Sequence, residues 1–199
     1  GAKVKPVYSQ TINLHDEGLT KRNSLRKSYT SLINWGLKEL KPSIYNSSNL
    51  DWSLMEDFRQ LHIHEAGRET RSVGSWKKQF EMVKADEAFV VLGTWQNKLV
   101  SAGFFPCNKL HCYYGSSASR RDLFHRPLFH ALMWSAIVYA REIGCHFFEV
   151  GELVFPNHPL CSSPNVKELS ISHFKAGFGG ETRISLDIEL DCEHINKHK

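Results

Sequence analysis

The chain has 199 residues and a mass of 22.8 kDa, which is long enough for one ordinary α/β domain. Hydrophobic residues make up 41% and charged residues 23%, a composition that excludes collagen-like, coiled-coil and disordered chains. No apolar run approaches the roughly 20 residues that cross a bilayer, and no secretion signal is recognisable. We therefore expect a cytoplasmic protein without a membrane span.

The net charge of +4 is concentrated in the N-terminal quarter of the chain. Residues 1–50 carry eight Lys or Arg and three Asp or Glu, whereas the remaining residues carry seventeen and eighteen. The basic cluster consists of Lys21, Arg22, Arg26 and Lys27. Such a cluster attracts phosphate on a cofactor, a nucleic acid or a lipid surface. The alternative is a solvated helix face.

Cysteine and histidine give no sign of a metal centre. The five cysteines are odd in number and form no CxxC pair, which favours reduced thiols. His62, His64 and Glu65 form an HxHE string, but this is neither the spacing of a zinc protease nor that of a zinc finger. We expect no metal.

The first half of the chain predicts one strand followed by three helices. A strand is expected from Val7 to Leu14, and Thr20 could cap a helix that runs to about Leu40. The polar stretch 42–49 reads as a loop around one short strand. Apolar residues every three or four positions predict two further helices, at 51–65 and 75–83.

The second half predicts mostly strands around one buried helix. Two β-rich runs, 88–95 and 99–105, flank the polar turn 96–98 and indicate a hairpin. A further strand is expected at 111–116, and Pro127 suits the first turn of a long, nearly wholly buried helix that ends near Gly144. A strand at 145–150 follows. This order predicts a single α/β domain with a mixed sheet over residues 1–199.

An anion site is expected where the buried helix begins. Ser119, Arg120, Arg121 and Asp122 lie between a strand and the helix N-terminus, where unpaired N–H groups, the helix dipole and two arginines attract negative charge. The alternative is a surface ion pair between Arg121 and Asp122.

Other charged residues suggest proton transfer and recognition. Glu149 and Glu152 lie near the C-terminal end of a strand, where a carboxylate could act as general base towards an amine. Either could equally pair with an arginine. Arg68 and Arg71 stand in a loop and suit carboxylate or phosphate recognition, with ordinary surface charge as the alternative.

The string FKAGFGG at residues 174–180 is the most unusual in the chain. Its three glycines suggest a close backbone approach near a ligand. Lys175 could stabilise developing negative charge or hold a phosphate. A turn with a snorkelling lysine is the alternative.

Three segments together resemble the Fem-type (FemAB/FemX-like) branch of the GNAT acyltransferase fold, which includes BioF-like and CelD-like proteins. They are KRNSLRKSYTSLINW at 21–35, the stretch 113–152 that begins YYGSS and ends FEVGE, and FKAGFGG at 174–180. The last is similar to the Phe-Lys-x-x-Phe-Gly signature of the family. With the hairpin at 88–105, the resemblance covers nearly the whole chain.

The resemblance implies a GNAT-like α/β (α+β) fold, with a central mixed, mostly antiparallel sheet flanked by helices. It also implies acyl transfer to an amine. Fem-type enzymes move an amino acid from aminoacyl-tRNA onto a peptidoglycan precursor, and many GNAT proteins use acyl-CoA. Carried over, the signature lysine that positions the donor and stabilises charge is Lys175, with Phe174 beside the donor.

We therefore expect an N-acyltransferase that uses acyl-CoA as co-substrate, without a metal. The acceptor is an amine on a cell-envelope precursor, an amino sugar or an amino acid, and a homodimer is compatible with this reading. The expected catalytic residues are Lys175, Glu152 and Glu149. The expected donor-binding residues are Phe174, Ser119, Arg120 and Arg121, and the expected acceptor-binding residues are Arg68, Arg71, Tyr113 and Tyr114.

Two alternatives stay open. The first is an aminoacyl-tRNA-dependent transferase, which would bind tRNA through the N-terminal basic cluster. The second is a non-catalytic ligand-binding domain of the same fold, because a fold alone does not imply activity.

Overall fold

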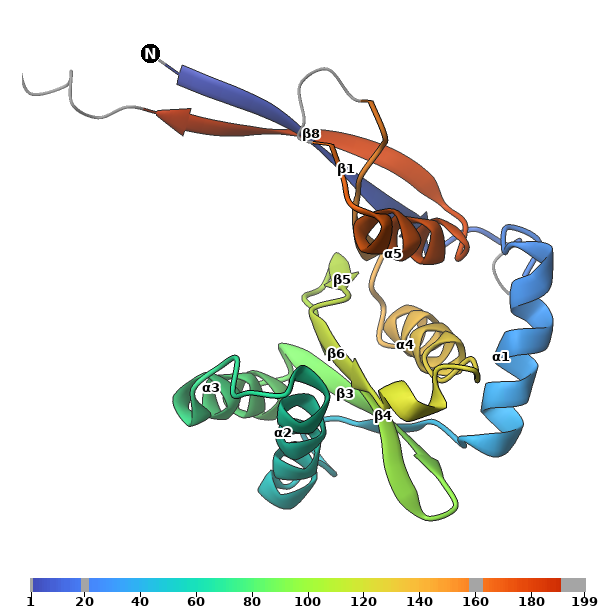
Figure 1. Cartoon of the computed structure of the whole chain (residues 1–199), viewed down its shortest axis with the longest axis vertical. Helices are drawn as coiled ribbons and strands as arrows, with labels where there is room; N and C mark the ends of the chain where they lie inside the picture. The colour runs from blue at the N-terminus through green and yellow to red at the C-terminus, as the bar shows by residue number, and fades with distance from the viewer. Residues whose placement is uncertain (1, 19–21, 158–162, 191–199) are drawn as a thin grey trace, which may run out of the picture.

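The computed structural model describes residues 2–18, 22–157 and 163–190, whose strands form two four-stranded sheets (Figure 1). The first has the order β5-β7-β1-β8, and the second has the order β2-β3-β4-β6. Neighbouring strands are antiparallel except β5 and β7, which are parallel. The expected mixed, mostly antiparallel α/β architecture is confirmed. The strands are β1 (Ala2–Asn13), β2 (Ser43–Tyr45), β3 (Ala88–Trp95), β4 (Lys98–Pro106), β5 (His111–Tyr113), β6 (Ser116–Ser119), β7 (Phe147–Leu153) and β8 (Glu181–Leu190).

In the described part of the chain, five α-helices pack around these sheets. In Figure 1, α2 and α3 lie beside the β2-β3-β4-β6 sheet, while α4 lies near the centre with α1 along it. Helix α5 packs on β7. Within the described residues, no helix is both long and apolar enough to span a membrane. The helices are α1 (Lys27–Glu39), α2 (Trp52–Ala66), α3 (Val73–Lys84), α4 (His130–Glu142) and α5 (Val166–Ala176), with a short 3-10 helix, η1 (Arg121–Leu123).

The β3–β4 hairpin is buried on both faces, which explains its nearly continuous apolar sequence. Successive side chains of a strand point to opposite faces. Phe89 and Val91 accordingly join the apolar cluster around α4, whereas Val90 and Leu92 join the cluster beneath α2 and α3. The hairpin turn is Gln96-Asn97, both with positive φ, as a tight two-residue turn requires. The sheet therefore separates two apolar clusters that share its strands.

Helix α4 is the most buried helix, as its composition predicts. Seven of its thirteen residues are buried. The helix begins at His130 and not at Pro127, which instead lies in the turn before it. The prediction of its start was therefore three residues early.

Helix α1 also begins later than predicted. Thr20, the expected cap, lies outside the described residues, and the helix starts at Lys27. Arg22 has a φ of 57°, and residues 22–24 form a turn. The N–H of Arg26 donates to the carbonyl of Gly177 at 2.9 Å. A contact with a distant segment therefore helps set where α1 begins, which local periodicity does not reveal.

The strand expected at 111–116 is divided between the two sheets. Residues 111–113 form β5 beside β7, and residues 116–119 form β6 beside β4. Between them, the N–H of Tyr114 donates to Glu149 and that of Gly115 to Phe104. This short segment therefore joins the two sheets.

The glycines of 174–180 approach the protein's own backbone. A Cβ on Gly179 would lie 2.4 Å from the Ser24 carbonyl oxygen, and one on Gly180 would lie 2.2 Å from that of Thr11. Both glycines have positive φ, near 80°. A close approach was predicted correctly, but the contact is with β1 and the segment before α1. Phe174 to Ala176 form the last turn of α5.

Gly177 packs against Tyr29 where α1 meets α5, and this contact gives a stability test. A Cβ at residue 177 would lie 2.3 Å from the Tyr29 ring, whereas one on Gly74 in α3 would meet nothing closer than 3.7 Å. We expect Gly177→Ala to lower the free energy of unfolding by about 1–3 kcal/mol, as overpacking does. Gly74→Ala should leave stability unchanged or raised, because alanine favours the helix.

The measurement is denaturant unfolding of both variants and the parent. If Gly177→Ala were as stable as Gly74→Ala, the packing of the α5 C-terminus on α1 would be wrong.

Candidate functional site

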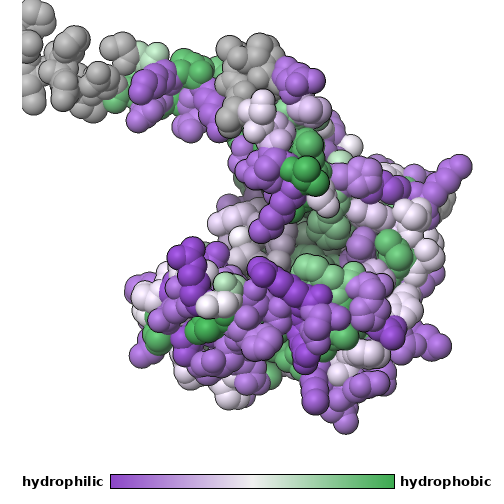
Figure 2. Space-filling view, viewed as in Figure 1, coloured by the Kyte–Doolittle hydropathy of each residue, from purple (hydrophilic) through white to green (hydrophobic). Residues whose placement is uncertain are grey.

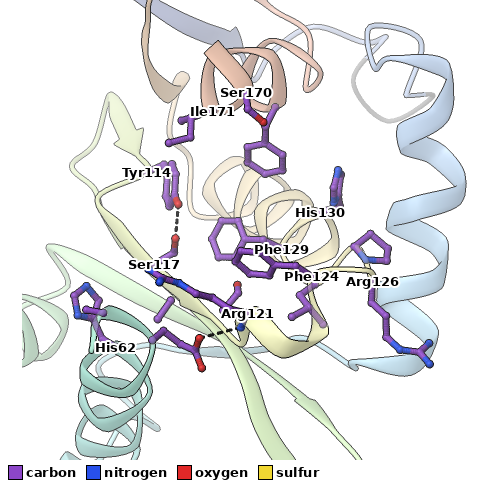
Figure 3. Close-up of a pocket in the computed structure, with 17 residues that line it drawn as sticks. His62, Tyr114, Ser117, Arg121, Phe124, Arg126, Phe129, His130, Ser170 and Ile171 are labelled. Atoms are coloured by element: carbon purple, nitrogen blue, oxygen red, sulfur yellow. Dashed lines mark hydrogen bonds between the residues drawn. The ribbon is translucent and has the colours of Figure 1, made fainter. Parts of the chain in front are cut away.

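A cavity of about 610 Å³ lies between α2, β6, the segment from η1 to α4, and α5. Figure 2 shows it as a hollow on this face, with hydrophobic side chains along it. In Figure 3, His62, Ser117 and Arg121 lie on one side, and Phe124, Phe129 and His130 on the other. The cavity therefore has a polar wall and an apolar wall.

Glu65 organises the polar wall. Its carboxylate accepts the backbone N–H of Arg121 at 2.9 Å, and its other oxygen lies 2.9 Å from Nδ1 of His64. The Glu65 side chain is only 10% exposed. A bound anion was expected at the backbone N–H groups of this segment. One of these N–H groups, that of Arg121, instead donates to the protein's own Glu65 carboxylate.

His62 presents an imidazole to the same cavity. Its ring packs edge-on against Trp76 with centroids 5.5 Å apart, and Thr70 Oγ1 lies 3.4 Å from its Nδ1. Among the described residues, none hydrogen-bonds to Nε2. Burial lowers the pKa of His62 from 6.5, and the positive charge of Arg71 lowers it further. The ring is therefore neutral at pH 7 and able to accept a proton.

A row of aromatic rings begins at Tyr114, beside Ser117, and reaches the other side of the cavity. Tyr114 lies 5.3 Å from Phe129 between ring centroids, and Phe129 lies 6.4 Å from Phe174. The Tyr114 hydroxyl is hydrogen-bonded to that of Ser117, and burial raises the pKa of this phenol. His130 packs 5.1 Å from Phe174, and burial lowers its pKa to about 4. These rings therefore carry no charge at neutral pH, whereas Arg126, which lines the same side, has its guanidinium 4.5 Å from the centroid of the Trp95 ring.

The structure brings several predicted site residues together and separates others. Ser119, Arg121, Phe174 and Tyr114 all line the cavity. Arg120 does not, because its guanidinium binds Asp122, with Nε 3.0 Å from the carboxylate. The surface ion pair considered for Arg121 is thus made by its neighbour.

Lys175, Glu149 and Glu152 form a separate group on α5 and β7, outside the cavity lining. Lys175 Nζ donates to the backbone carbonyl of Glu152 at 3.0 Å. The Lys175 side chain passes over Gly151. This glycine has a φ of 111° and lies at a bulge in the β1–β7 pairing. Burial lowers the pKa of Lys175 against the opposing effect of both carboxylates. The catalytic roles implied for these three residues stay predictions.

The predicted acceptor residues are more dispersed. Arg68, Arg71 and Tyr113 lie outside the cavity lining. The Arg71 guanidinium lies 5.9 Å from the Trp76 ring. Arg71 therefore does not line the cavity, but its positive charge lowers the pKa of His62, which does.

The N-terminal basic cluster is partly engaged inside the molecule. Arg22 lies over the Trp134 ring at 5.0 Å and donates to Asn34, and Arg26 donates to the carbonyl of His173 at 2.9 Å. Lys21 lies outside the described residues. Two of the four cations expected to attract phosphate therefore hold α1 in place.

His62 and Glu65 were not among the predicted site residues. The HxHE string that contains them lacks metal-ligand spacing. Residues three apart share one face of a helix, so the pair on α2 was visible in the sequence. The missing information was that this face borders a cavity.

Several solved structures share this fold. A FemX structure matches 89% of this chain with a TM-score of 0.67 and 12% identity. The C-terminal domain of a putative lysylphosphatidylglycerol synthetase from Agrobacterium fabrum matches 94%, with a TM-score of 0.67 and 14% identity. An aminoglycoside acetyltransferase from an uncultured soil metagenomic sample matches 70%, with a TM-score of 0.51 and 11% identity.

The chain spans about 60% of the FemX and synthetase structures and 88% of the acetyltransferase. No family model matches, and no curated protein matches. These likenesses establish a GNAT-like fold of the kind found in FemX.

The neutral state of His62 gives a prediction that needs no substrate. In Arg71→Gln the pKa of His62 should rise, because a nearby positive charge is removed, but it should stay below 6.5 because burial remains. Arg68→Gln, in the same loop, is the matched control and should leave this pKa unchanged.

The measurement is an NMR titration of the histidine ring signals in the full chain. An identical His62 pKa in Arg71→Gln and the parent would contradict the packing of Arg71 beside this ring.

Proposed function

We propose that this protein is an N-acyltransferase whose reaction takes place in the 610 Å³ cavity, with acyl-CoA as donor and a small amine as acceptor. The acceptor class comprises amino sugars, amino acids and cell-envelope precursors. The GNAT-like fold supports acyl transfer in general. The single observation that carries the proposal is the neutral His62 imidazole in the cavity that Arg121 also lines.

The chemistry is direct transfer. The amine nitrogen attacks the carbonyl carbon of the thioester, a C–N bond forms, and the C–S bond breaks. The nitrogen loses one proton to Nε2 of His62. The resulting imidazolium then gives this proton to the thiolate leaving group. A neutral imidazole suits this role because general bases work best with a pKa near the operating pH.

Arg121 is the proposed partner of the donor's phosphate. Its backbone is fixed by Glu65, so its side chain extends from a constrained position. Arginine suits phosphate because its planar guanidinium makes two parallel hydrogen bonds. Lys175 follows Phe174 in α5, but its Nζ is bound to the carbonyl of Glu152 outside the cavity lining, so its role in stabilising charge on the donor stays a prediction.

An aminoacyl-tRNA donor is the second candidate, supported by the structural similarity to FemX. Since Arg22 and Arg26 already contact other parts of the molecule, this candidate depends on the remaining basic residues. Tight, salt-sensitive binding of aminoacyl-tRNA, with no binding of acyl-CoA, would favour it.

A donor-binding assay should distinguish the adjacent residues Arg120 and Arg121. Acetyl-CoA at 100 times its Kd should stabilise the parent by about 2.7 kcal/mol, which raises Tm by roughly 5–10 °C in a domain of this size. Arg121→Gln should lose most of this shift. Arg120→Gln should retain it, because Arg120 is bound to Asp122 outside the cavity.

The measurement is a thermal-shift titration of the three proteins with acetyl-CoA and free CoA. Equal shifts in Arg121→Gln and the parent would remove Arg121 from the donor site. The absence of any shift in the parent would overturn the CoA donor.

Replacement of His62 tests the chemical step. His62→Gln should lower kcat by about 10²–10⁴-fold, the usual contribution of a general base. The parent's activity should fall as the pH drops through the His62 pKa, below 6.5, because the protonated ring accepts no proton. That acid limb should be absent from His62→Gln.

His111→Gln, an exposed histidine on β5, is the control and should match the parent. The measurement is the pH–rate profile of thiol release from acetyl-CoA with an amine acceptor. If the limb persists in His62→Gln and disappears in Glu149→Gln, the proton acceptor is that carboxylate.

A further inference from the structure

We infer that the cavity selects a donor whose acyl group is an apolar chain of several carbon atoms, longer than acetyl. This inference rests on the proposed function and names the substrate class of the same site. It is carried by the apolar wall, by two exposed hydrophobic side chains at its edge, and by the placement of the polar groups.

The apolar wall is continuous across three elements. The rings of Tyr114, Phe129 and Phe174 follow one another at centroid separations of 5.3 and 6.4 Å. They come from the residue after β5, the residue before α4, and the last turn of α5. A surface of this kind offers contacts to methylene groups and few hydrogen bonds to a polar acyl group.

Two large hydrophobic residues stay exposed at this cavity. Phe124, after η1, is 64% exposed, and Ile171, on α5, is 43% exposed, yet both line the cavity. They come from different segments of the lining, and Figure 3 shows them on different sides of the hollow. Exposed apolar side chains that gather at a cavity mark a surface that a ligand covers.

The charged groups of the cavity determine the direction in which the donor's acyl chain would lie. His62, Glu65 and Arg121 are on the polar wall, and Arg126, on the other side of the lining, has its guanidinium over the Trp95 ring, 4.5 Å from the centroid. The thioester and phosphate groups of a donor therefore belong at the polar wall and its acyl chain at the aromatic wall.

The test is a chain-length series. We would measure the affinity of the full chain for acetyl-, butyryl-, hexanoyl- and octanoyl-CoA by isothermal titration. Each buried CH₂ should tighten binding by up to about fourfold. The same series of free carboxylates, from acetate to octanoate, and of alkylamines, from ethylamine to octylamine, forms the second and third arms.

Variants locate the effect. Ile171→Ser and Phe124→Ser should each weaken octanoyl-CoA binding by about five- to tenfold and weaken acetyl-CoA binding less, so that the gain in affinity with chain length becomes smaller. Ile143→Ser is the matched control, because Ile143 is 44% exposed at the end of α4 and lies outside the cavity. Circular dichroism spectra would verify that all three variants are folded.

The outcomes separate this inference from the proposed function. Equal affinity for all four acyl-CoA esters would overturn the apolar chain and leave the CoA donor standing. No CoA ester binding, with carboxylates that bind more tightly as they lengthen and depend on Ile171, would keep the chain site and overturn the CoA donor. Chain-length dependence in the amines alone would overturn the assignment of the chain to the donor.

Discussion

The close approach of the α5–β8 turn to the N-terminal segments is the constraint on which the site depends. Gly177, Gly179 and Gly180 each lie where a Cβ would meet another part of the chain within 2.4 Å. The contacts are with Tyr29 of α1, with the segment before α1, and with β1. Helix α5 carries one wall of the cavity, so the glycines after it fix where that wall stands.

Polar interactions hold the same junction from the other side. Tyr29 donates its hydroxyl proton to the carbonyl of Phe174 at 2.9 Å, and the Arg26 guanidinium donates to that of His173. Tyr29 also packs edge-on against His130 of α4, with ring centroids 4.6 Å apart. One buried tyrosine thus connects α1, α4 and α5, and Phe174 reaches the cavity because its backbone is anchored behind it.

The opposite wall is positioned by the second sheet and α2. Glu65 and His62 share one face of α2, and the carboxylate of Glu65 accepts the backbone N–H of Arg121 on the same wall. Because the β2-β3-β4-β6 sheet is buried on both faces, its flanking helices are held rigidly relative to one another. The polar wall is therefore preorganised, which is what an electrostatic site requires.

The sequence by itself determined the local elements and the fold class. The two β-rich runs around a polar turn in 88–105 predicted the hairpin, the apolar run of α4 predicted its burial, and the glycines of 174–180 predicted a close approach. Each of these features depends on residues close together in the sequence or on whether a helix or strand face is apolar, so composition and spacing were sufficient to predict it. The resemblance to Fem-type proteins, built on the order of the motifs, correctly anticipated the GNAT-like fold.

Only the tertiary structure decided which side chains meet. Arg120 and Arg121 are adjacent and chemically identical, yet one binds Asp122 and the other lines the cavity. Arg22 and Arg26 looked free and are occupied by Trp134 and His173, while His62 and Glu65 looked incidental and border the cavity. The direction of a side chain depends on backbone angles and on contacts with residues far along the chain, and one-dimensional spacing contains neither.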